Sequence, residues 1–241
     1  MNETINTIMK RKSVRAFTDQ PIKSEDKEII LEAAFRAPTA GNQQLYTIID
    51  ITDDDLKKEL VPLCDGQDFI ADAKMVLIFL ADCLKWYDAY LSVGAAPREP
   101  AIGDLMLAVS DANIAAQNAV IAAESLGIGS CYIGDIMENC EELRKTLSLP
   151  KYVFPAAMLV FGYPTEGCKN RKPIARIDAN YTVQKNKYIR LSDDELRSAL
   201  EWKSGKLSYE EWLTAFCNRK YNSEFSREMS RSVEVYLEDF K

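Results

Sequence analysis

The chain contains no histidine among its 241 residues. This absence excludes serine–histidine–aspartate and cysteine–histidine nucleophiles, and it excludes histidine ligands for zinc or iron. The phosphate-binding pattern GxxxxGK[ST] is also missing, and GIGSCYIG at 127–134 has Tyr132 where a dinucleotide fingerprint needs its third glycine. We expect no metal site and no catalytic side chain, so a cofactor would carry the chemistry of any reaction.

Basic residues are outnumbered, with 30 Lys and Arg against 37 Asp and Glu and a formal charge of -7. No broad basic face is indicated, which argues against a nucleic-acid partner. The apolar run at 75–81 is too short to span a membrane, and the N-terminus has no apolar core of signal-peptide length. The six cysteines form no CxxC pair. We therefore expect a cytoplasmic protein with reduced, mostly buried thiols.

Apolar patterns predict a layered domain in which strands alternate with helices. Strands are expected at 45–51, 74–82, 130–136 and 156–164. Helices are expected near the N-terminus, after a Ser24 cap, around 56–60 after a Thr52 cap, at 101–126 and at 139–147, with two tail helices that begin in capping boxes at Ser192 and Ser208. We predict one domain over 1–241, with a core of about 1–177 and a helical extension of about 178–241.

Three cations lie within five residues near the N-terminus, in the stretch RKSVRAF at 11–17. If the backbone is extended, Arg11, Ser13 and Arg15 share one side while Val14 points to the other. If it is helical, Arg11 and Arg15 are neighbours one turn apart. Either geometry offers guanidinium groups and a hydroxyl to an anion such as phosphate. The alternative is a solvated basic turn that pairs with surface carboxylates.

A second basic cluster, Lys169 and Arg171, follows the last predicted strand. Ligands in open α/β sheets bind beyond the carboxyl ends of strands, so the two clusters could converge on one phosphate. Uncharged polar residues lie between them in sequence: Thr39, Asn42 and Gln43 in one loop, Gln67 before a strand, and the IGD stretch at 133–135. Amides suit a heterocycle edge with donors and acceptors, although each of these residues could instead satisfy its own turn.

The chain contains five informative stretches in this order: RKSVRAF, APTAGNQQ, GQDFIADAKMVLIFLAD, LGIGSCYIGDI and FGYPTEGCKNRKP. Together they resemble the FMN-dependent nitroreductases, and most closely their flavin-reductase branch. The resemblance covers about residues 5–175. It implies an α+β fold, a layered sheet flanked by helices, in a homodimer whose subunits embrace and hold FMN at their interface.

The resemblance also implies roles for individual residues. Arg11, Ser13, Arg15, Lys169 and Arg171 would hold the ribityl phosphate, and Gln67 would bond the pyrimidine edge. Ile133 and Gly134 would lie beside the ring, and the loop at 38–42 would approach from the other subunit. The implied cofactor-binding residues are Arg11, Lys12, Ser13, Arg15, Pro38, Thr39, Ala40, Asn42, Gln67, Ile133, Gly134, Lys169 and Arg171.

Two positions depart from the family pattern. Ala40 replaces a serine that family members often carry, which would remove one hydrogen bond to the flavin. Asp135 follows Gly134 where this branch often has a second glycine, and an acid near the ring would disfavour an anionic reduced flavin unless its side chain turns away.

The implied activity is an NAD(P)H-dependent reduction of nitroaromatics, quinones or flavins, with hydride transfer at flavin N5 in a two-electron ping-pong cycle. Two alternatives stay open, a flavin reductase that releases reduced FMN and a non-catalytic flavin-binding or storage protein. A binder of phosphorylated metabolites without flavin is a further, less favoured alternative. The tail cations Arg219, Lys220, Arg227 and Arg231 are either ligands for the extra phosphate of NADPH or ordinary helix-surface charges, and Trp86, Tyr87 and Tyr90 either cover the flavin or pack a helix face.

Overall fold

The structure, a computed structural model, describes residues 1–241. It divides into two compact units, one of Met1–Pro173 with Glu228–Lys241 and the other of Ile174–Arg227. Residues 228–241 thus group with the first 173 residues, whereas the sequence placed them in the C-terminal extension. The first unit contains every stretch that carries the family resemblance.

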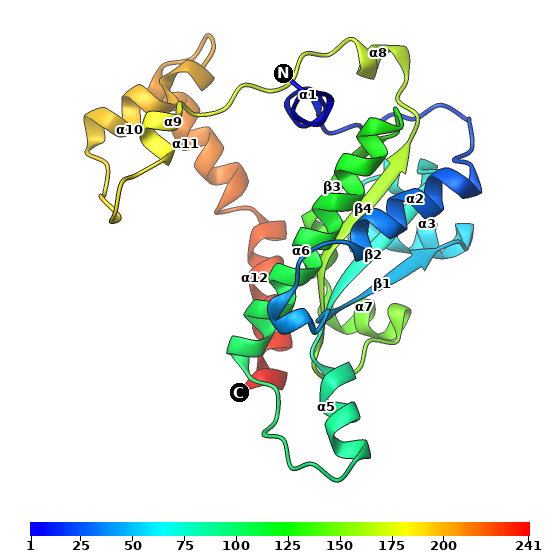
Figure 1. The fold of residues 1–241 in the computed structure, drawn as a ribbon. Helices are drawn as coiled ribbons and strands as arrows, with labels where there is room; N and C mark the ends of the chain where they lie inside the picture. The colour runs from blue at the N-terminus through cyan, green and yellow to red at the C-terminus, as the bar shows by residue number, and fades with distance from the viewer. The chain divides into compact units, whose positions relative to one another are not determined.

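The sheet of the first unit has four antiparallel strands in the order β1-β2-β4-β3 (Figure 1). The strands are β1 (Tyr46–Ile51), β2 (Met75–Asp82), β3 (Gly129–Ile133) and β4 (Val153–Gly162). The expected α+β layered fold is confirmed. The argument from strand carboxyl ends was wrong for this sheet, because antiparallel pairing sets the end of β4 beside the start of β3. Gly129 and Gly162 are paired across the two strands.

Both faces of the sheet are covered, and β2 is buried along its whole length. Its residues alternate between two apolar clusters because successive side chains point to opposite faces. Leu77 and Phe79 join the cluster under α2 (Ser24–Phe35) and α6 (Ile102–Ser125). Val76 and Ile78 join the cluster under α3 (Asp54–Leu63), α4 (Phe69–Asp72) and α7 (Cys140–Leu147). The layers are therefore helices, sheet and helices.

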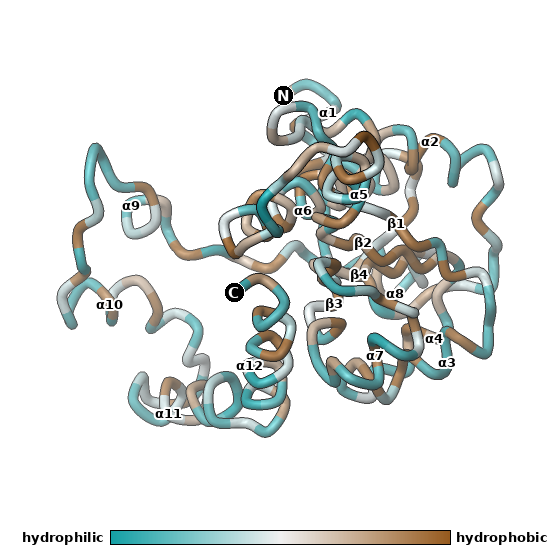
Figure 2. The backbone as a smooth tube through the Cα atoms, turned by 90° about the horizontal axis from the view of Figure 1, so that it is seen from below, coloured by the Kyte–Doolittle hydropathy of each residue, from teal (hydrophilic) through white to brown (hydrophobic).

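Helix α6 is the longest element and lies against the sheet, with α2 beside it (Figure 1). Its alanines at 108, 112, 115, 116 and 119 are fully buried, so the helix approaches its neighbours closely. By length and hydropathy α6 could cross a membrane, but 44% of the relevant window is buried inside the protein. A core helix passes the same test, and the tube of Figure 2 shows hydrophobic colour on α6 and on the sheet alike.

Several local expectations need correction. Helix α2 begins at Ser24 itself, after Lys23, and no side chain caps it. Helix α3 is capped by Asp53, whose carboxylate accepts from the backbone N–H groups of Asp55 and Leu56, and not by Thr52. Strand β3 ends at Ile133, and residues Gly134–Met137 form a 3₁₀ turn, η2. The carboxylate of Asp53 is a stronger acceptor than the threonine hydroxyl one position earlier.

The remaining elements that lie wholly within the first unit are short. They are α1 (Glu3–Lys10), η1 (Ala40–Asn42), α5 (Leu84–Ser92), α8 (Glu166–Lys169) and η4 (Glu238–Phe240). The second unit contains α9 (Ala179–Thr182), α10 (Asp193–Leu200), η3 (Glu201–Lys203) and α11 (Tyr209–Lys220), and α12 (Glu224–Leu237) begins in it. Both predicted capping boxes, at Ser192 and Ser208, are confirmed.

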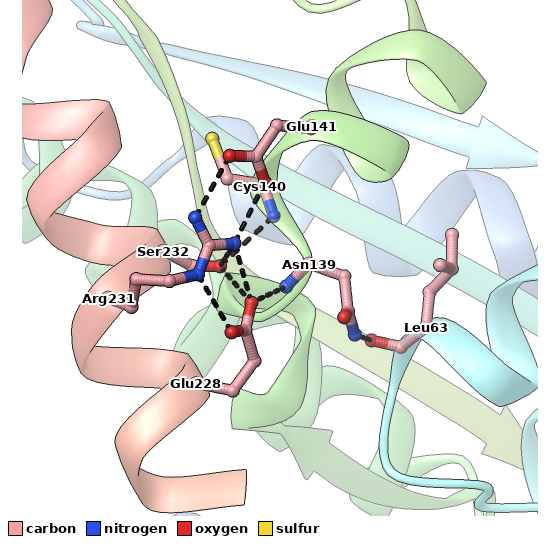
Figure 3. Close-up of polar contacts among 7 residues, drawn as sticks. All are labelled: Leu63, Asn139, Cys140, Glu141, Glu228, Arg231 and Ser232. Carbon is pink, nitrogen blue, oxygen red and sulfur yellow. Dashed lines mark hydrogen bonds and ion pairs between the residues drawn. The ribbon is translucent and has the colours of Figure 1, made fainter.

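Side chains of α12 satisfy the open N-terminus of α7 (Figure 3). Asn139 has a left-handed backbone and supplies no side-chain cap. The Ser232 hydroxyl accepts from the Cys140 N–H at 3.0 Å, and a Glu228 carboxylate oxygen accepts from the Asn139 N–H at 3.2 Å. Helix ends leave such donors unpaired, so these contacts replace the missing local cap. They hold residues 228–241 on the core.

Arg231 completes this cluster by pairing with both Glu141 and Glu228 (Figure 3). The hydrogen bond from Arg231, followed by those from Ser232 and the Asn139 N–H, lowers the pKa of Glu228 from 4.5 to about 2. A depressed acid pKa stabilises the fold above the unfolded value, and this contribution is lost as the pH falls toward 2. The attachment of α12 is therefore sensitive to acid.

We predict that Ser232→Ala lowers the free energy of unfolding by about 1–3 kcal/mol at neutral pH, because the buried Cys140 N–H loses its acceptor. Chemical denaturation measures this change. Ser125→Ala is the matched control, since that hydroxyl is exposed and donates only to the Ala122 carbonyl. Equal stability of the two variants would contradict the capping role of Ser232.

Candidate functional site

Two glycines make room for the N-terminal segment on the sheet. A Cβ at Gly129 would lie 2.5 Å from Val14 Cγ2, and a Cβ at Gly162 would lie 2.7 Å from the ring of Phe17. These distances are far below van der Waals contact, so only glycine fits at both positions. Val14 and Phe17 therefore lie directly on the ends of β3 and β4.

Backbone hydrogen bonds fix the same segment along the sheet. The Val14 N–H donates to the Ser130 carbonyl at 2.9 Å, and Ser13 and Ser130 form a parallel bridge. The Thr18 N–H donates to the Tyr163 carbonyl at 2.8 Å. The extended alternative is thus correct: Val14 is buried, whereas Ser13 and Arg15 on either side are exposed.

Lys12 joins the two basic clusters. Its ammonium donates to the carbonyl oxygens of Lys169 and Arg171, each at 2.6 Å. The two stretches lie more than 150 positions apart in sequence, so this ammonium fixes the loop after α8 against the N-terminal segment. Lys12 acts mainly as the anchor of that loop, with one ammonium hydrogen left over.

The guanidinium groups of the site have no acidic partners. Arg11, Arg15 and Arg171 form no ion pair, and Lys169 pairs only with Glu166 at 2.6 Å. The alternative of a basic turn neutralised by surface carboxylates therefore fails for both N-terminal arginines. Unpaired guanidinium forks beside an exposed hydroxyl are suited to an oxyanion.

A cavity of about 430 Å³ opens at this cluster. Its lining is basic and apolar. Lys10, Lys12 and Lys169 supply the cations, and Val14, Pro164 and Pro173 supply the apolar surface. Glu124, at the end of α6, is the acidic group of the lining, and burial raises its pKa while Arg11 and Lys12 act in the opposite direction. The cavity favours an anion with an apolar extension.

Gln67 lies at the other end of this part of the site. Its Nε2 donates to the Asp135 carboxylate at 2.7 Å and to the Cys64 carbonyl at 3.0 Å. Arg15 lies between, with its guanidinium carbon 5.9 Å from the centre of the Phe69 ring. The structure thus brings Gln67 and the IGD stretch together, as the resemblance implies. Asp135 turns toward Gln67.

The predicted residues follow β3 as a track from one end of the strand to the other. Gly129, with Lys12 and the 169–171 loop near it, marks the cationic end, and Ile133 with Gly134 marks the end at Gln67. Five strand residues span about 13 Å between their outer Cα atoms. Cations at one end and an amide at the other, at this spacing, suit an elongated ligand with a phosphate and a polar ring edge.

The loop of Pro38, Thr39, Ala40 and Asn42 is fixed elsewhere, by a residue that the sequence analysis missed. The buried Asp111 carboxylate of α6 accepts from the Ala40 N–H at 2.9 Å and from the Leu45 N–H at 3.2 Å. Its only sequence signal was an acid within an otherwise alanine-rich helix face. At 1.5 Å per residue, Asp111 is about 20 Å along α6 from Glu124. Within one chain this loop is not brought to the cationic end.

The aromatic residues of α5 pack and also line a separate cavity. Trp86 and Tyr87 contact the core, and the Trp86 Nε1–H donates to the Gln43 carbonyl at 2.6 Å. With Tyr90 they line a cavity of about 290 Å³ that also contains Arg98 and Asp104. The packing alternative is therefore supported, and the rings also face a cavity separate from the track; that they cover a flavin stays a prediction.

Three of the four tail cations are engaged inside their own units. Arg231 pairs with Glu141 and Glu228, as described. The Arg219 guanidinium lies over the Phe216 ring, and the Lys220 ammonium lies over the Phe225 ring. These contacts favour ordinary helix-surface charges over ligands for NADPH.

All six cysteines are free, and five of them are buried.

The fold defines an α+β protein, and the track along β3 is suited to an elongated ligand that carries an anionic group. Residues 8–163 match the Nitroreductase family. An FMN reductase (NAD(P)H) of Bacillus subtilis is 34% identical over 242 residues, which cover 99% of this chain and 92% of that protein. An oxygen-insensitive NADPH nitroreductase of Salmonella typhimurium is 36% identical over 193 residues, which cover 80% of this chain and 78% of that protein.

Solved structures agree with this assignment. NfrA2 of B. megaterium has a TM-score of 0.86 at 28% identity and covers 100% of this chain and 99% of that one. The NfrA1 nitroreductase of B. subtilis has a TM-score of 0.82 at 26% identity, with 95% and 98% covered. The chain belongs to the nitroreductase family, and the expected resemblance is confirmed.

We predict that Gly162→Ala lowers the free energy of unfolding by about 1–3 kcal/mol, because the added methyl group would overlap the Phe17 ring. Denaturant unfolding measures the loss. Gly103→Ala is the control, since a Cβ there meets nothing within 4 Å and the helix gains about 0.5–1 kcal/mol. A Gly162→Ala variant as stable as wild type would contradict the close packing.

Lys12→Met should release the loop after α8, because two carbonyl oxygens lose their shared donor. Limited trypsin digestion measures this effect, with cleavage between Lys169 and Lys172 expected to become about fivefold faster or more. Lys10→Met is the matched control, because Lys10 is exposed and forms no such bond. Equal cleavage rates in the two variants would show that Lys12 does not anchor the loop.

Proposed function

We propose that the chain is an FMN-dependent oxidoreductase that uses NAD(P)H to reduce nitroaromatics, quinones or flavins. The observation that carries this proposal is the track along β3, with Lys12, Lys169 and Arg171 at one end, Arg15 along it and Gln67 at the other. The curated relatives named FMN reductase and NADPH nitroreductase support it. We also propose that the protein is cytoplasmic and that its two units form one domain.

The residues of the cationic end fit the phosphate of FMN. Arg11, Arg15 and Arg171 form no ion pair with a carboxylate, and the Ser13 hydroxyl is exposed between the two N-terminal arginines. Lys169 adds a further positive charge, although Glu166 shares it. Charge-assisted bonds from several donors bind a phosphate more strongly than neutral ones do. This set would hold the phosphate, and Lys12 would keep the set together.

The opposite end fits the polar edge of a flavin ring. Both hydrogens of the Gln67 amide are used inside the protein, so its carbonyl oxygen is the group left for a ligand. Gly134 has no atom within 4 Å of its Cβ position, so a ring would meet little obstruction there. When bound, FMN supplies two-electron hydride chemistry between NAD(P)H and an acceptor. The chain contributes binding and orientation, and we assign no acid, base or nucleophile to it.

We further propose that the protein is a homodimer and that the 38–42 loop completes the site of the partner subunit. Within one chain this loop lies far along α6 from the cationic end. The exposed apolar side chains of α6 are suited to a subunit contact, since Met106 and Leu107 are 52% and 50% exposed. Helix α1 buries no residue, and Ile8 and Met9 on it are exposed.

A reductase that releases reduced FMN is the second candidate. The relative named FMN reductase, which matches almost the whole chain, favours it. In that case FMN would be a substrate, and dilution would remove it from the protein. The storage alternative predicts bound flavin but no oxidation of NAD(P)H with any acceptor.

We predict that Arg15→Ala weakens FMN binding by about 10–100-fold and riboflavin binding by about twofold or less, because only FMN carries the phosphate. Quenching of flavin fluorescence gives both dissociation constants.

Steady-state rates with NADPH and a quinone should give parallel double-reciprocal lines for the wild type.

Arg36→Ala is the matched control, since Arg36 is exposed and pairs with Glu32 within its own helix. It should bind both flavins like the wild type. Equal losses of FMN and riboflavin affinity in Arg15→Ala would contradict the phosphate assignment.

A further inference from the structure

We propose that Asp135 and Glu138 form a positioning pair that shares one proton and fixes the amide of Gln67 with its carbonyl oxygen toward the flavin site. The inference rests on the proposed FMN site, and it assigns a role to two acids that the family resemblance does not cover. Asp135 stands where this branch often has glycine. Glu138 was not singled out by the sequence.

The first step concerns the direction of the Gln67 amide. Its Nε2 has two acceptors, the Asp135 carboxylate at 2.7 Å and the Cys64 carbonyl at 3.0 Å. With the proton of the pair on Glu138, neither acceptor can donate, so a reversed amide would place its oxygen against two oxygens. The Cys64 carbonyl belongs to the backbone, so its position does not depend on a side-chain rotamer. Asp135 supplies the stronger, charged half of this lock.

The second step concerns the charge behind Asp135. Glu138 is 4% exposed, its Oε1 is buried without a partner, and its carboxyl group lies beside that of Asp135, three positions earlier. Burial first, and then the bond to Asp135 and the charges of Asp135, Asp65 and Glu228, raise its pKa to about 8. Glu138 is therefore protonated at neutral pH, and its O–H donates to the Asp135 carboxylate.

The groups around Glu138 explain why the proton is retained. Asp135 comes from the same 3₁₀ turn, Asp65 from the loop after α3 and Glu228 from α12, and all three are acids. The Cys64 thiol also lies near, and burial together with Asp135 and Glu138 raises its pKa. Arg231, on the same helix as Glu228, pairs with Glu141 and Glu228.

One proton between two carboxyl groups leaves one negative charge. The carboxylate that carries this charge accepts the hydrogen bond from Gln67 Nε2. This bond reduces the unfavourable effect of an acid beside the proposed flavin site. Loss of the proton above pH 8 would leave two adjacent carboxylates, which repel each other. The turn at 134–138 would then lose the geometry that orients Gln67.

The test measures FMN dissociation constants by fluorescence quenching from pH 6.5 to 9.5. For the wild type we expect affinity to fall about tenfold as Glu138 ionises. In E138Q, the amide keeps a donor for Asp135 and cannot ionise, so its affinity should change by about twofold or less over the range. In Asp135→Ala, affinity should be about tenfold weaker at every pH.

Glu142→Gln is the matched control, because Glu142 is exposed on α7 and should follow the wild-type profile. Thermal unfolding of the flavin-free protein adds a readout that needs no cofactor. A raised acid pKa costs stability as the pH climbs from 4.5 to about 8, so the melting temperature of wild type should fall more over this range than that of E138Q.

The outcomes separate the two proposals. If wild type binds FMN and E138Q has the same pH profile, the shared-proton pair is wrong while the FMN site remains. If wild type binds no FMN at any pH, the proposed function fails and the positioning role fails with it. Parallel melting profiles of wild type and E138Q would also overturn the shared proton.

Discussion

The close approach of Val14 and Phe17 to Gly129 and Gly162 is the contact on which the site depends. The two glycines are paired across β3 and β4, and side chains at either position would push the N-terminal segment off the sheet. With the segment in place, alternation along an extended backbone turns Ser13 and Arg15 outward while Val14 is buried. Packing of two apolar residues thus determines where the side chains of Ser13 and Arg15, both in the proposed phosphate site, face solvent.

The length of helix α6 separates the 38–45 loop from the cationic end of the site, and this separation is the reason for the proposed second subunit. The helix covers one face of the sheet, and its buried Asp111 holds the 38–45 loop about 20 Å from the end of the helix near the cations. The exposed apolar residues on its other side have no partner within the chain. One helix therefore organises the core, fixes a loop that would serve the other site, and offers a surface for the contact.

Much of the fold and the site could be predicted from the sequence, and the misses have physical causes. Periodicity and capping boxes indicated the long helix and the tail helices, because these signals are local. Antiparallel pairing was missed because a doubly covered sheet of either kind has continuously apolar strands. Lys12 as a loop anchor and Asp111 as a loop clamp depend on contacts across 157 and 71 positions. No pattern within a short window shows such contacts.

The same limit applies to the acids beside Gln67. The sequence showed Asp135 as a departure from the family pattern and left open where its carboxylate turns. The structure directs it to Gln67 and adds Glu138, which is buried near it and whose pKa burial and the neighbouring acids raise to about 8. The proposed pair would place one negative charge, and not two, beside the proposed flavin site, and it arises from this chain's own residues and from no motif.

A visible absorption spectrum of the purified protein, repeated after anaerobic addition of NADPH, tests the central claim most directly. The account predicts flavin bands near ~450 nm, present as purified or after adding FMN, that bleach when NADPH is added and return with a quinone. Bands that persist with both NADPH and NADH would show that the protein binds flavin without catalysing its reduction. A protein that stays colourless with added FMN would contradict the account.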